Sequence, residues 1–273
     1  HIFERMICYV YHYKAMVIYY AESMETIADN LKEVQPVTFS TVPRLLEKVY
    51  DKIVAKGYTL KWPKKSLFFW ALKLGHKFEL GRKNGAWYHF KLKIADKLIF
   101  SKWRAALGGN VKIIVTGASA LQQRLARVFT SAGITVLEGY GLTETSPVIS
   151  VTTPDESGRR FGTVGPVISG VTVKIAADGE ILCKGPNVMQ GYYKNPEATK
   201  DAIDAEGWFH TGDIGVFVED KFLKITDRKK ELFKTSGGKY IAPQPMENKF
   251  KESPFIEQIM VIGENEKFPG ALI

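Results

Sequence analysis

The sequence predicts an α/β fold: a parallel sheet with flanking helices in the first half, then a small β-rich region. A strand at 111–115 (VKIIV) is followed by a loop, a helix from Leu121 to Ala132 and a second strand at 134–138. This alternation is typical of parallel sheets, whose functional loops leave the carboxyl ends of the strands. After Pro147, short strands separated by Gly/Pro turns predict the β-rich region.

Upstream of these strands, apolar residues at helical spacing predict three helices, at 42–56, 64–80 and 88–106, with the breaker Asn84-Gly85 between the last two. We expect the apolar stripes of the second and third helices to face the core: Leu67, Trp70, Leu74 and Ile94, Leu98, Trp103. The apolar run Met6–Ala21 is shorter than the ~20 residues that span a membrane, so it predicts a buried strand or helix.

Downstream, the pattern predicts strands at 171–175, 180–184, 214–218, 222–226 and 256–262 and a helix near 244–252. A change of composition at Asp227–Arg228 indicates a boundary between subdomains. We therefore expect three parts: 1–150, an α/β subdomain with a basic helical insert near 57–106; 151–226, a β-rich subdomain; and the charged, Gly-rich region 227–273.

Composition excludes several classes of protein. The 273 residues are 45% hydrophobic, enough for a folded core. Two distant cysteines and five histidines without ligand spacing argue against a disulfide framework and a Cys/His metal site. A reduced, cytoplasmic setting is the expectation.

The net charge of +9 is uneven, because 44–104 holds 16 Lys/Arg against 4 Asp/Glu. This basic surplus could face an anionic membrane, a nucleic acid or a polyphosphate, or could simply be solvated helix faces.

The segment Glu138–Thr145 (EGYGLTET) follows a predicted strand and combines residue types suited to a nucleotide. A Gly-flanked aromatic ring can stack on a purine, a Thr hydroxyl can donate to a phosphate, and a Glu can hold Mg²⁺, which prefers oxygen ligands. Taken alone, a Gly-rich strand exit is often only a turn.

Two later segments offer complementary groups. In 207–213 (GWFHTGD), a tight Thr-Gly turn would present Asp213 to a diol such as ribose, although an ordinary hairpin Asp would look the same. In 227–243 (DRKKELFKTSGGKYIAP), Arg228 offers a planar fork of donors, and the Gly pair lets the backbone approach a ligand closely.

Together these motifs resemble the adenylate-forming (ANL) superfamily of acyl-CoA synthetases, luciferases and adenylation domains. The matching segments appear in the family's order: TGASAL at 116–121, YGLTET at 140–145, GEILCKGPNVMQGYYKNPEAT at 179–199, GWFHTGD at 207–213 and DRKKELFKTSGGKYIAP at 227–243. TVPRLLEKVYDKI at 41–53 and the basic insert are similar to the bacterial long-chain-fatty-acid–CoA ligase branch. The resemblance implies the second half of the ANL large domain, with a barrel-like β subdomain, then the start of the C-terminal α+β lid at 227.

The resemblance also implies residue roles. The residues expected around adenine are Gly117, Ala118, Ser119, Gly139 and Tyr140. Those expected at the phosphate and Mg²⁺ are Thr143 and Glu144, and those at the ribose are Asp213 and Arg228. Lys230 corresponds to the hinge of the lid, and Gly237 and Gly238 to the loop that turns towards the CoA channel.

The implied reaction is ATP-dependent activation of a fatty acid to acyl-AMP and transfer to coenzyme A, with Mg²⁺ offsetting negative charge. The family's phosphate loop and lid lysine have no match in the chain, so we expect an internal fragment, inactive alone and prone to self-association.

A ligase for another carboxylic acid is the main alternative. No nucleic-acid-binding motif is recognised. Peripheral association with the inner face of an anionic membrane stays open.

Overall fold

A computed structural model describes residues 1–253 and 255–273, which form two compact units. We call residues 1–140 with 151–162 the α/β unit, and residues 141–150 with 163–273 the β-rich unit. Each unit has its own sheet and its own buried residues. Asp227–Arg228, predicted as a subdomain boundary, lies at the end of a strand inside the β-rich unit, and the three-part division stays a prediction.

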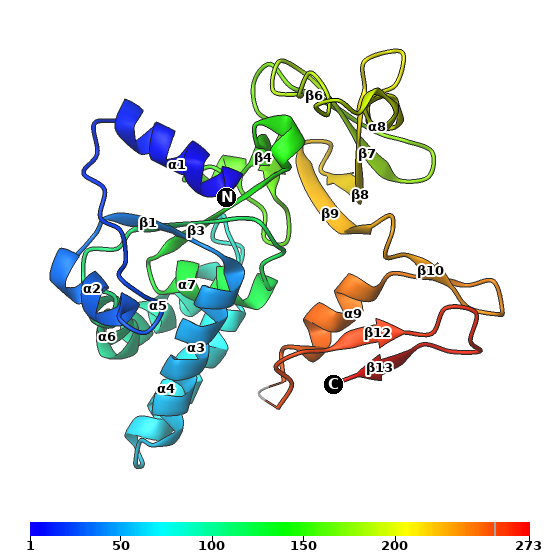
Figure 1. Cartoon of the computed structure of the whole chain (residues 1–273). Coiled ribbons are helices and arrows are strands. Elements are labelled where there is room, and N and C mark those ends of the chain that lie inside the picture. Colours follow the sequence, from blue (N-terminus) through cyan, green and yellow to red (C-terminus); the bar gives the residue numbers. More distant parts are fainter. Residues whose placement is uncertain (254) are drawn as a thin grey trace. The chain divides into compact units, whose positions relative to one another are not determined.

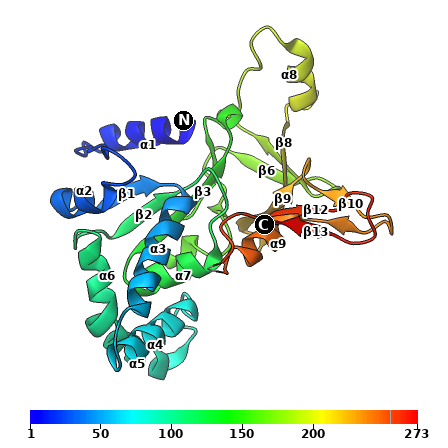
Figure 2. The ribbon, with the colours of Figure 1, turned by 60° about the horizontal axis from the view of Figure 1, so that its bottom comes forward.

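The α/β unit contains the parallel strands β1, β2 and β3, which are neighbours in that order in a four-stranded sheet; Thr38 lies opposite Ile113 and Ile113 opposite Thr135. Figures 1 and 2 show α3 and α7 on one face of this sheet and α1 on the other. The elements are α1 Ile2–Tyr13, α2 Ile27–Val34, β1 Thr38–Thr41, α3 Pro43–Tyr58, α4 Lys64–His76, α5 Gly85–Ala95, the π-helical turn η1 Asp96–Phe100, α6 Ser101–Ala106, β2 Ile113–Thr116, α7 Gln123–Ser131, β3 Thr135–Gly141 and η3 Glu156–Gly158.

The β-rich unit contains a five-stranded antiparallel sheet in the order β5-β9-β8-β7-β6. Its buried side chains include Ile181, Phe209, Phe222 and Leu223. The elements are η2 Thr143–Thr145, β4 Val148–Val151, β5 Gly165–Pro166, β6 Thr172–Ile175, β7 Glu180–Lys184, α8 Pro196–Ala202, β8 Phe209–Val218, β9 Phe222–Arg228, β10 Phe233–Lys234, β11 Tyr240–Ile241, α9 Pro243–Phe250, β12 Met260–Ile262 and β13 Gly270–Leu272.

The predicted α/β architecture is confirmed, but two predictions about burial are wrong. Met6–Ala21 is not core: α1 buries only Ile7 among its described residues, and Tyr13 and Val17 are exposed. A helix can turn only one stripe towards a sheet, and a run that is apolar all round leaves its other faces in solvent.

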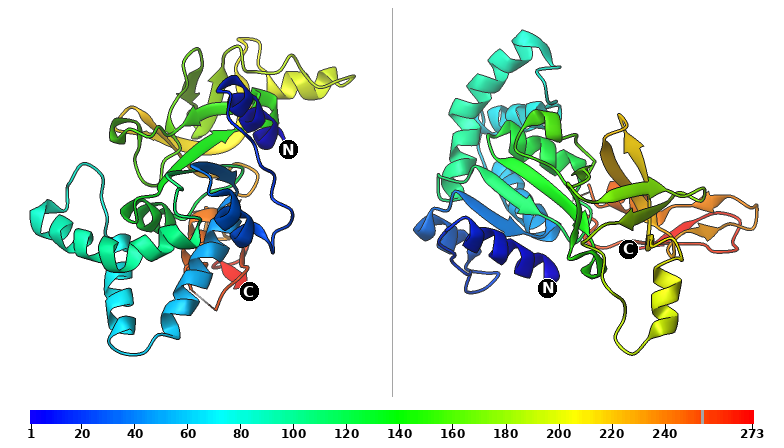
Figure 3. Two further views of the ribbon diagram at one scale, coloured as in Figure 1. Left: turned by 90° about the vertical axis from the view of Figure 1, so that its left-hand side faces the viewer. Right: turned by 90° about the horizontal axis from the view of Figure 1, so that it is seen from above.

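The third predicted helix is the continuous rod α5–η1–α6 (Figure 3), and only part of its predicted stripe faces inwards. Trp103 is buried, whereas Ile94 and Leu98 are 38% and 41% exposed. The π-helical turn η1, which contains Leu98, has more residues per turn than an α-helix and shifts the phase of the helix between Ile94 and Trp103. Residues at α-helical spacing therefore do not stay on one face of the helix across this turn.

A close helix contact depends on Gly75 of α4, which packs against α7. A Cβ added at Gly75 would lie 2.7 Å from Val128 Cγ2 and 2.8 Å from Ser131 Oγ, and Val128 is fully buried. These distances are shorter than van der Waals contact, so the two helices approach as they do only because residue 75 is glycine.

We predict that Gly75→Ala destabilises the chain. Overpacking typically costs about 1–3 kcal/mol and outweighs the gain of up to ~1 kcal/mol in helix propensity, so a net loss of about 1–2 kcal/mol is expected in urea unfolding. The double variant Gly75→Ala/Val128→Ala should lose less stability than the sum of the two single variants. Strict additivity of the two effects would contradict a steric contact here.

Candidate functional site

In the α/β unit, predicted site residues gather where β2 and β3 end. Thr116 and Glu138 are neighbours in the parallel register, so the loop that follows β2 starts beside the last residues of β3. A Cβ added at Gly117 would lie 3.3 Å from the carbonyl oxygen of Gly139. Ala118 has a positive φ of 69°, and both Ala118 and Ser119 are exposed. Four of the predicted residues therefore form one surface of backbone at the sheet's carboxyl edge, and Tyr140 follows them in β3.

Glu138 also lies at this edge, and the sequence alone assigned it no role. Its backbone N–H donates to Thr152 Oγ1 at 2.8 Å, and its carbonyl accepts from Thr152 N at 2.9 Å. Its side chain is crowded by protein atoms although partly accessible, and this burial raises the pKa of Glu138 to about 8. At neutral pH the carboxyl is therefore mostly protonated and can donate a hydrogen bond to a ligand.

In the β-rich unit, Glu144 lies in the 3₁₀ turn η2. Its carboxylate accepts a hydrogen bond from the hydroxyl of Tyr192 at 3.0 Å, and its carbonyl accepts from Met189 N at 2.8 Å. Burial and this carboxylate raise the pKa of Tyr192. Thr143, next to Glu144, is exposed. Tyr192 belongs to the motif at 179–199, but only the fold reveals its contact with Glu144.

The donor set at Glu144 fits a magnesium ion that is shared with a substrate. Among the described residues, no cluster of three His, Cys, Asp or Glu side chains could hold a metal by itself. Mg²⁺ commonly takes one or two carboxylates and completes its shell with waters and substrate phosphates. A single carboxylate held in place by Tyr192 is compatible with that arrangement.

Asp213 and Arg228 are brought together by the pairing of β8 with β9, in which they are direct cross-strand partners. Arg228 Nε lies 3.6 Å from Asp213 Oδ1; the Asp213 side chain is 10% exposed and that of Arg228 62%. The expectation of a tight turn at Asp213 is wrong, because the residue lies inside β8. Hydrogen bonding to β7 and β9 extends that strand through the Gly-containing segment, where Gly212 adopts a φ of 72°.

A buried carboxylate supports this pair from β7. Glu180 Oε1 accepts from Gly212 N at 2.9 Å, while Oε2 accepts from Lys229 Nζ at 2.8 Å and lies 3.2 Å from His210 Nδ1. Lys229 N also donates to Gly212 O at 2.8 Å. Gly212 precedes Asp213 and Lys229 follows Arg228, so Glu180 holds both segments that carry the pair.

The remaining predicted residues lie after β9. Lys230 is exposed in the turn that follows the strand, where Glu231 N donates to Arg228 O at 3.0 Å. Gly237 and Gly238 form the exposed tip of the β10–β11 hairpin, and Gly238 has a φ of 79°. Only glycine adopts that conformation without strain.

The structure thus collects Gly117–Ser119, Gly139 and Tyr140 in one unit, and Thr143, Glu144, Asp213 and Arg228 in the other. That they surround one common nucleotide remains a prediction. None of the helices described in residues 1–253 and 255–273 is long and apolar enough to cross a membrane.

Parallel strands with a glycine-rich carboxyl edge, followed by the Asp213–Arg228 pair, agree with the fold that the resemblance to adenylate-forming enzymes implies. The sequence profile described as AMP-binding enzyme matches residues 1–193, and that of the AMP-binding enzyme C-terminal domain matches residues 231–273. The chain belongs to the AMP-binding enzyme family.

Within the family, the chain is similar to long-chain-fatty-acid–CoA ligases. It is 36% identical over 276 residues to one from Mycobacterium tuberculosis, covering 100% of this chain and 45% of the relative. It is also 36% identical over 283 residues to human long-chain-fatty-acid–CoA ligase 1, covering 97% of this chain and 38% of that protein. The chain therefore spans less than half the length of these relatives.

Solved structures agree on the fold. O-succinylbenzoate coenzyme A synthetase from Bacillus subtilis, in complex with AMP, superposes with a TM-score of 0.68 at 21% identity, covering 99% of this chain and 48% of that one. The anthranilate CoA ligase AuaEII gives a TM-score of 0.64 at 17% identity, covering 94% and 43%. The predicted fold class is confirmed.

We predict that Glu180→Gln destabilises the β-rich unit by about 2–3 kcal/mol at pH 7. This is less than the ~3–5 kcal/mol typical of breaking a fully buried ion pair, because the Lys229 side chain is 46% exposed and solvent screens its charge. Burial opposes ionisation of Glu180, but hydrogen bonds from Lys229, His210 and Gly212 outweigh it and lower its pKa. A lowered carboxyl pKa stabilises the fold above the unfolded-state value of about 4.3, and this stabilisation is lost as pH falls through the folded-state pKa.

Urea unfolding at pH 7 and pH 4 measures both effects, and the difference between Glu180→Gln and the unsubstituted chain should shrink in acid. Glu206→Gln is the matched control, because Glu206 is exposed and its carboxylate lies 3.9 Å from Lys174 Nζ. Equal stability losses in the two variants would contradict the role of Glu180.

Proposed function

We propose that the chain is part of a long-chain fatty acid–CoA ligase, which uses ATP and Mg²⁺ to form acyl-AMP and then transfers the acyl group to coenzyme A. The observation that carries the proposal is the Asp213–Arg228 pair at the end of β9, because it places a buried carboxylate and an exposed guanidinium 3.6 Å apart. The similarity to long-chain-fatty-acid–CoA ligases over the whole chain supports the substrate class.

The pair suits the ribose of a nucleotide. The two hydroxyls of a diol can both donate to one carboxylate, and Arg228 can donate to a ribose or phosphate oxygen. Glu180 accepts hydrogen bonds from the backbone of Gly212 and from the side chain of Lys229, which flank the pair, and thereby preorganises it. Gly117, Ala118, Ser119 and Gly139 would border the adenine, because a backbone without bulky side chains lets a planar base lie close, and Tyr140 would stack on the ring.

Thr143 and Glu144 would act at the phosphate groups of ATP. When a fatty carboxylate attacks the α-phosphorus, two anions meet, so cations and donors must offset the growing negative charge. The Thr143 hydroxyl is exposed and can donate to a phosphate oxygen. Glu144, held by Tyr192, would ligate Mg²⁺, which supplies charge neutralisation when bound.

The region after β9 would form the hinge and the start of the lid. Lys229 bonds Glu180 and Asp178, whose carboxylate lies 2.7 Å away, whereas the next residue, Lys230, is exposed in a turn. A rotation at Lys230 would therefore begin just beyond an anchored residue. Gly237 and Gly238, at the hairpin tip, would line the approach of the CoA thiol.

We predict that AMP binds this chain and that binding depends on the pair. Calorimetric titration should show at least tenfold weaker binding for Arg228→Ala and for Asp213→Asn, because each removes a charge-assisted hydrogen bond. Lys224→Ala removes a cation from the same strand, β9, and should leave the affinity unchanged. Equal losses in Lys224→Ala and Arg228→Ala would reject the ribose role.

Glu144→Ala should leave AMP affinity unchanged but abolish the strengthening of ATP binding by Mg²⁺. In the whole protein, pyrophosphate release across acids of different chain length tests the substrate. Release with long-chain fatty acids supports the proposal; release only with aryl or amino acids would identify the alternative, a ligase for another acid.

A second proposal concerns the surface of α5 and η1. Trp87, Phe90, Ile94 and Leu98 lie at helical spacing and are 66%, 54%, 38% and 41% exposed. Trp87 stacks on Phe90 with ring centroids 5.5 Å apart, and Lys91 lies 5.0 Å above the Trp87 ring. An exposed apolar stripe beside lysines is the pattern of peripheral binding to anionic membranes.

We predict that the chain cosediments with anionic vesicles and that Trp87→Ser/Phe90→Ser reduces this binding about tenfold, because burial of aromatic area drives insertion. Trp62→Ser is the control, since Trp62 is 83% exposed but lies outside the stripe. Binding that survives loss of the stripe, or that fails equally in the control, would rule out this surface.

A further inference from the structure

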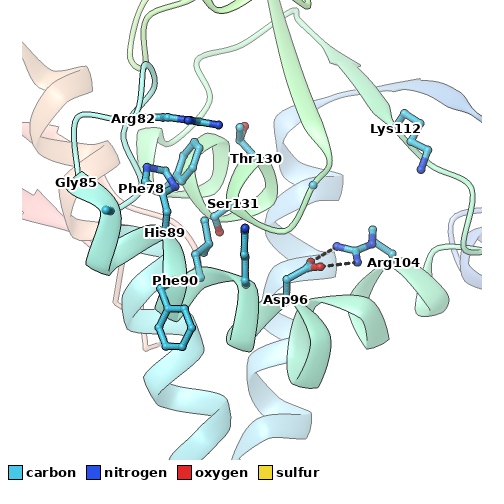
Figure 4. A pocket seen from close by; sticks show the side chains of 14 residues that line it. Phe78, Arg82, Gly85, His89, Phe90, Asp96, Arg104, Lys112, Thr130 and Ser131 are labelled. Carbon is cyan, nitrogen blue, oxygen red and sulfur yellow. Dashed lines mark hydrogen bonds and ion pairs between the residues drawn. The ribbon is translucent and has the colours of Figure 1, made fainter.

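The α/β unit contains an open hollow of about 860 Å³ that the proposed function does not use. It lies between α5, the end of α7 and the segment before β2, and Figure 4 shows Arg82, His89, Phe90 and Thr130 around it. None of the predicted nucleotide-site residues lines it. Its volume is in the range of pockets that hold small organic ligands.

Four cationic side chains and one carboxylate line this hollow: Arg82, Lys93, Arg104, Lys112 and Asp96. The carboxylate is already neutralised, because Arg104 binds both oxygens of Asp96, with Nη2 at 3.2 Å from Oδ2, and also donates to Ala132 O at 2.6 Å. The dashed lines in Figure 4 mark the two Arg104–Asp96 contacts.

The other three cations, Arg82, Lys93 and Lys112, are not neutralised. None has an acidic partner within 4.0 Å anywhere in residues 1–253 and 255–273. Cations gathered around one concave surface repel each other, and the field in a hollow is focused because its walls have a low dielectric constant. An anion that binds there relieves this repulsion.

The walls indicate what kind of anion fits. Phe78, Phe90 and Leu92 add apolar surface beside the cations. A guanidinium offers a planar fork to phosphate oxygens, and lysines add point charges. The hollow is much larger than a single phosphate, whose molecular volume is well below the ~300 Å³ of the smallest ligand pockets. The remainder of the ligand would therefore lie against the aromatic side chains.

We propose that this hollow is an anion site that binds the phosphate group of an organic phosphate. It accounts for part of the basic surplus between Arg44 and Arg104, since Arg82, Lys93 and Arg104 belong to that region. A phosphate monoester can belong to a soluble molecule or to the headgroup of phosphatidic acid, and both present the same phosphate group.

Calorimetric titration with pyrophosphate tests the site in the chain that carries Arg228→Ala, which removes the proposed nucleotide contact. Pyrophosphate should bind, and Arg82→Ala/Lys93→Ala should weaken binding at least tenfold. The matched control is Lys91→Ala, which removes a cation from the same helix, α5, outside the hollow. Arg82 and Lys93 are exposed, so the variants should fold, and thermal unfolding checks this.

Competition identifies the source of the phosphate. If phosphatidic acid vesicles bind the chain and pyrophosphate displaces them, the site takes a lipid headgroup; pyrophosphate binding without such displacement points to a soluble ligand. The proposal is overturned if pyrophosphate does not bind, or if Lys91→Ala weakens binding as much as Arg82→Ala/Lys93→Ala. These outcomes are independent of whether AMP binds at Arg228.

Discussion

The central constraint in the β-rich unit is the buried carboxylate of Glu180. A buried charge must be paired and hydrogen-bonded, and Glu180 satisfies this through Gly212 N, Lys229 Nζ and His210 Nδ1. Because those partners flank Asp213 and Arg228, one electrostatic requirement also aligns β8 with β9 and sets the geometry of the proposed ribose site. Stability and site geometry therefore depend on the same few contacts.

Two clusters of charged side chains differ in how their charges are balanced. In the β-rich unit, the charges around Glu180 are neutralised locally, since Lys229 contacts both Asp178 and Glu180. The α/β unit leaves three cations without acidic partners at a hollow, among the residues the structure describes. Locally balanced charge rigidifies a site, whereas an unbalanced cluster attracts counterions from solvent. The first arrangement suits a preorganised nucleotide contact and the second suits recruitment of an anion.

The sequence predicted helices and strands correctly where the apolar residues of the periodic pattern are also the buried ones. The helices α3 and α7 and the strands β2, β3 and β7 lie close to their predicted ranges, because each has one face against a sheet or core. It failed at Ile94 and Leu98, where a π-helical turn breaks the period, and at Met6–Ala21, where α1 buries only Ile7 and its other faces are in solvent. It also mistook Asp213 for a turn residue, because glycines signal turns in sequence but here lie in a paired strand.

The order of the motifs, the residue types in them and the α/β class all follow from the linear chain, since they rest on local pattern and chemistry. The contact partners of the site residues do not follow from the linear chain. The contact between Tyr192 and Glu144 joins residues 48 positions apart, and the support that Glu180 gives to the Asp213–Arg228 pair depends on strand pairing. Local patterns carry no information about such long-range contacts, which arise only when the sheets and helices pack.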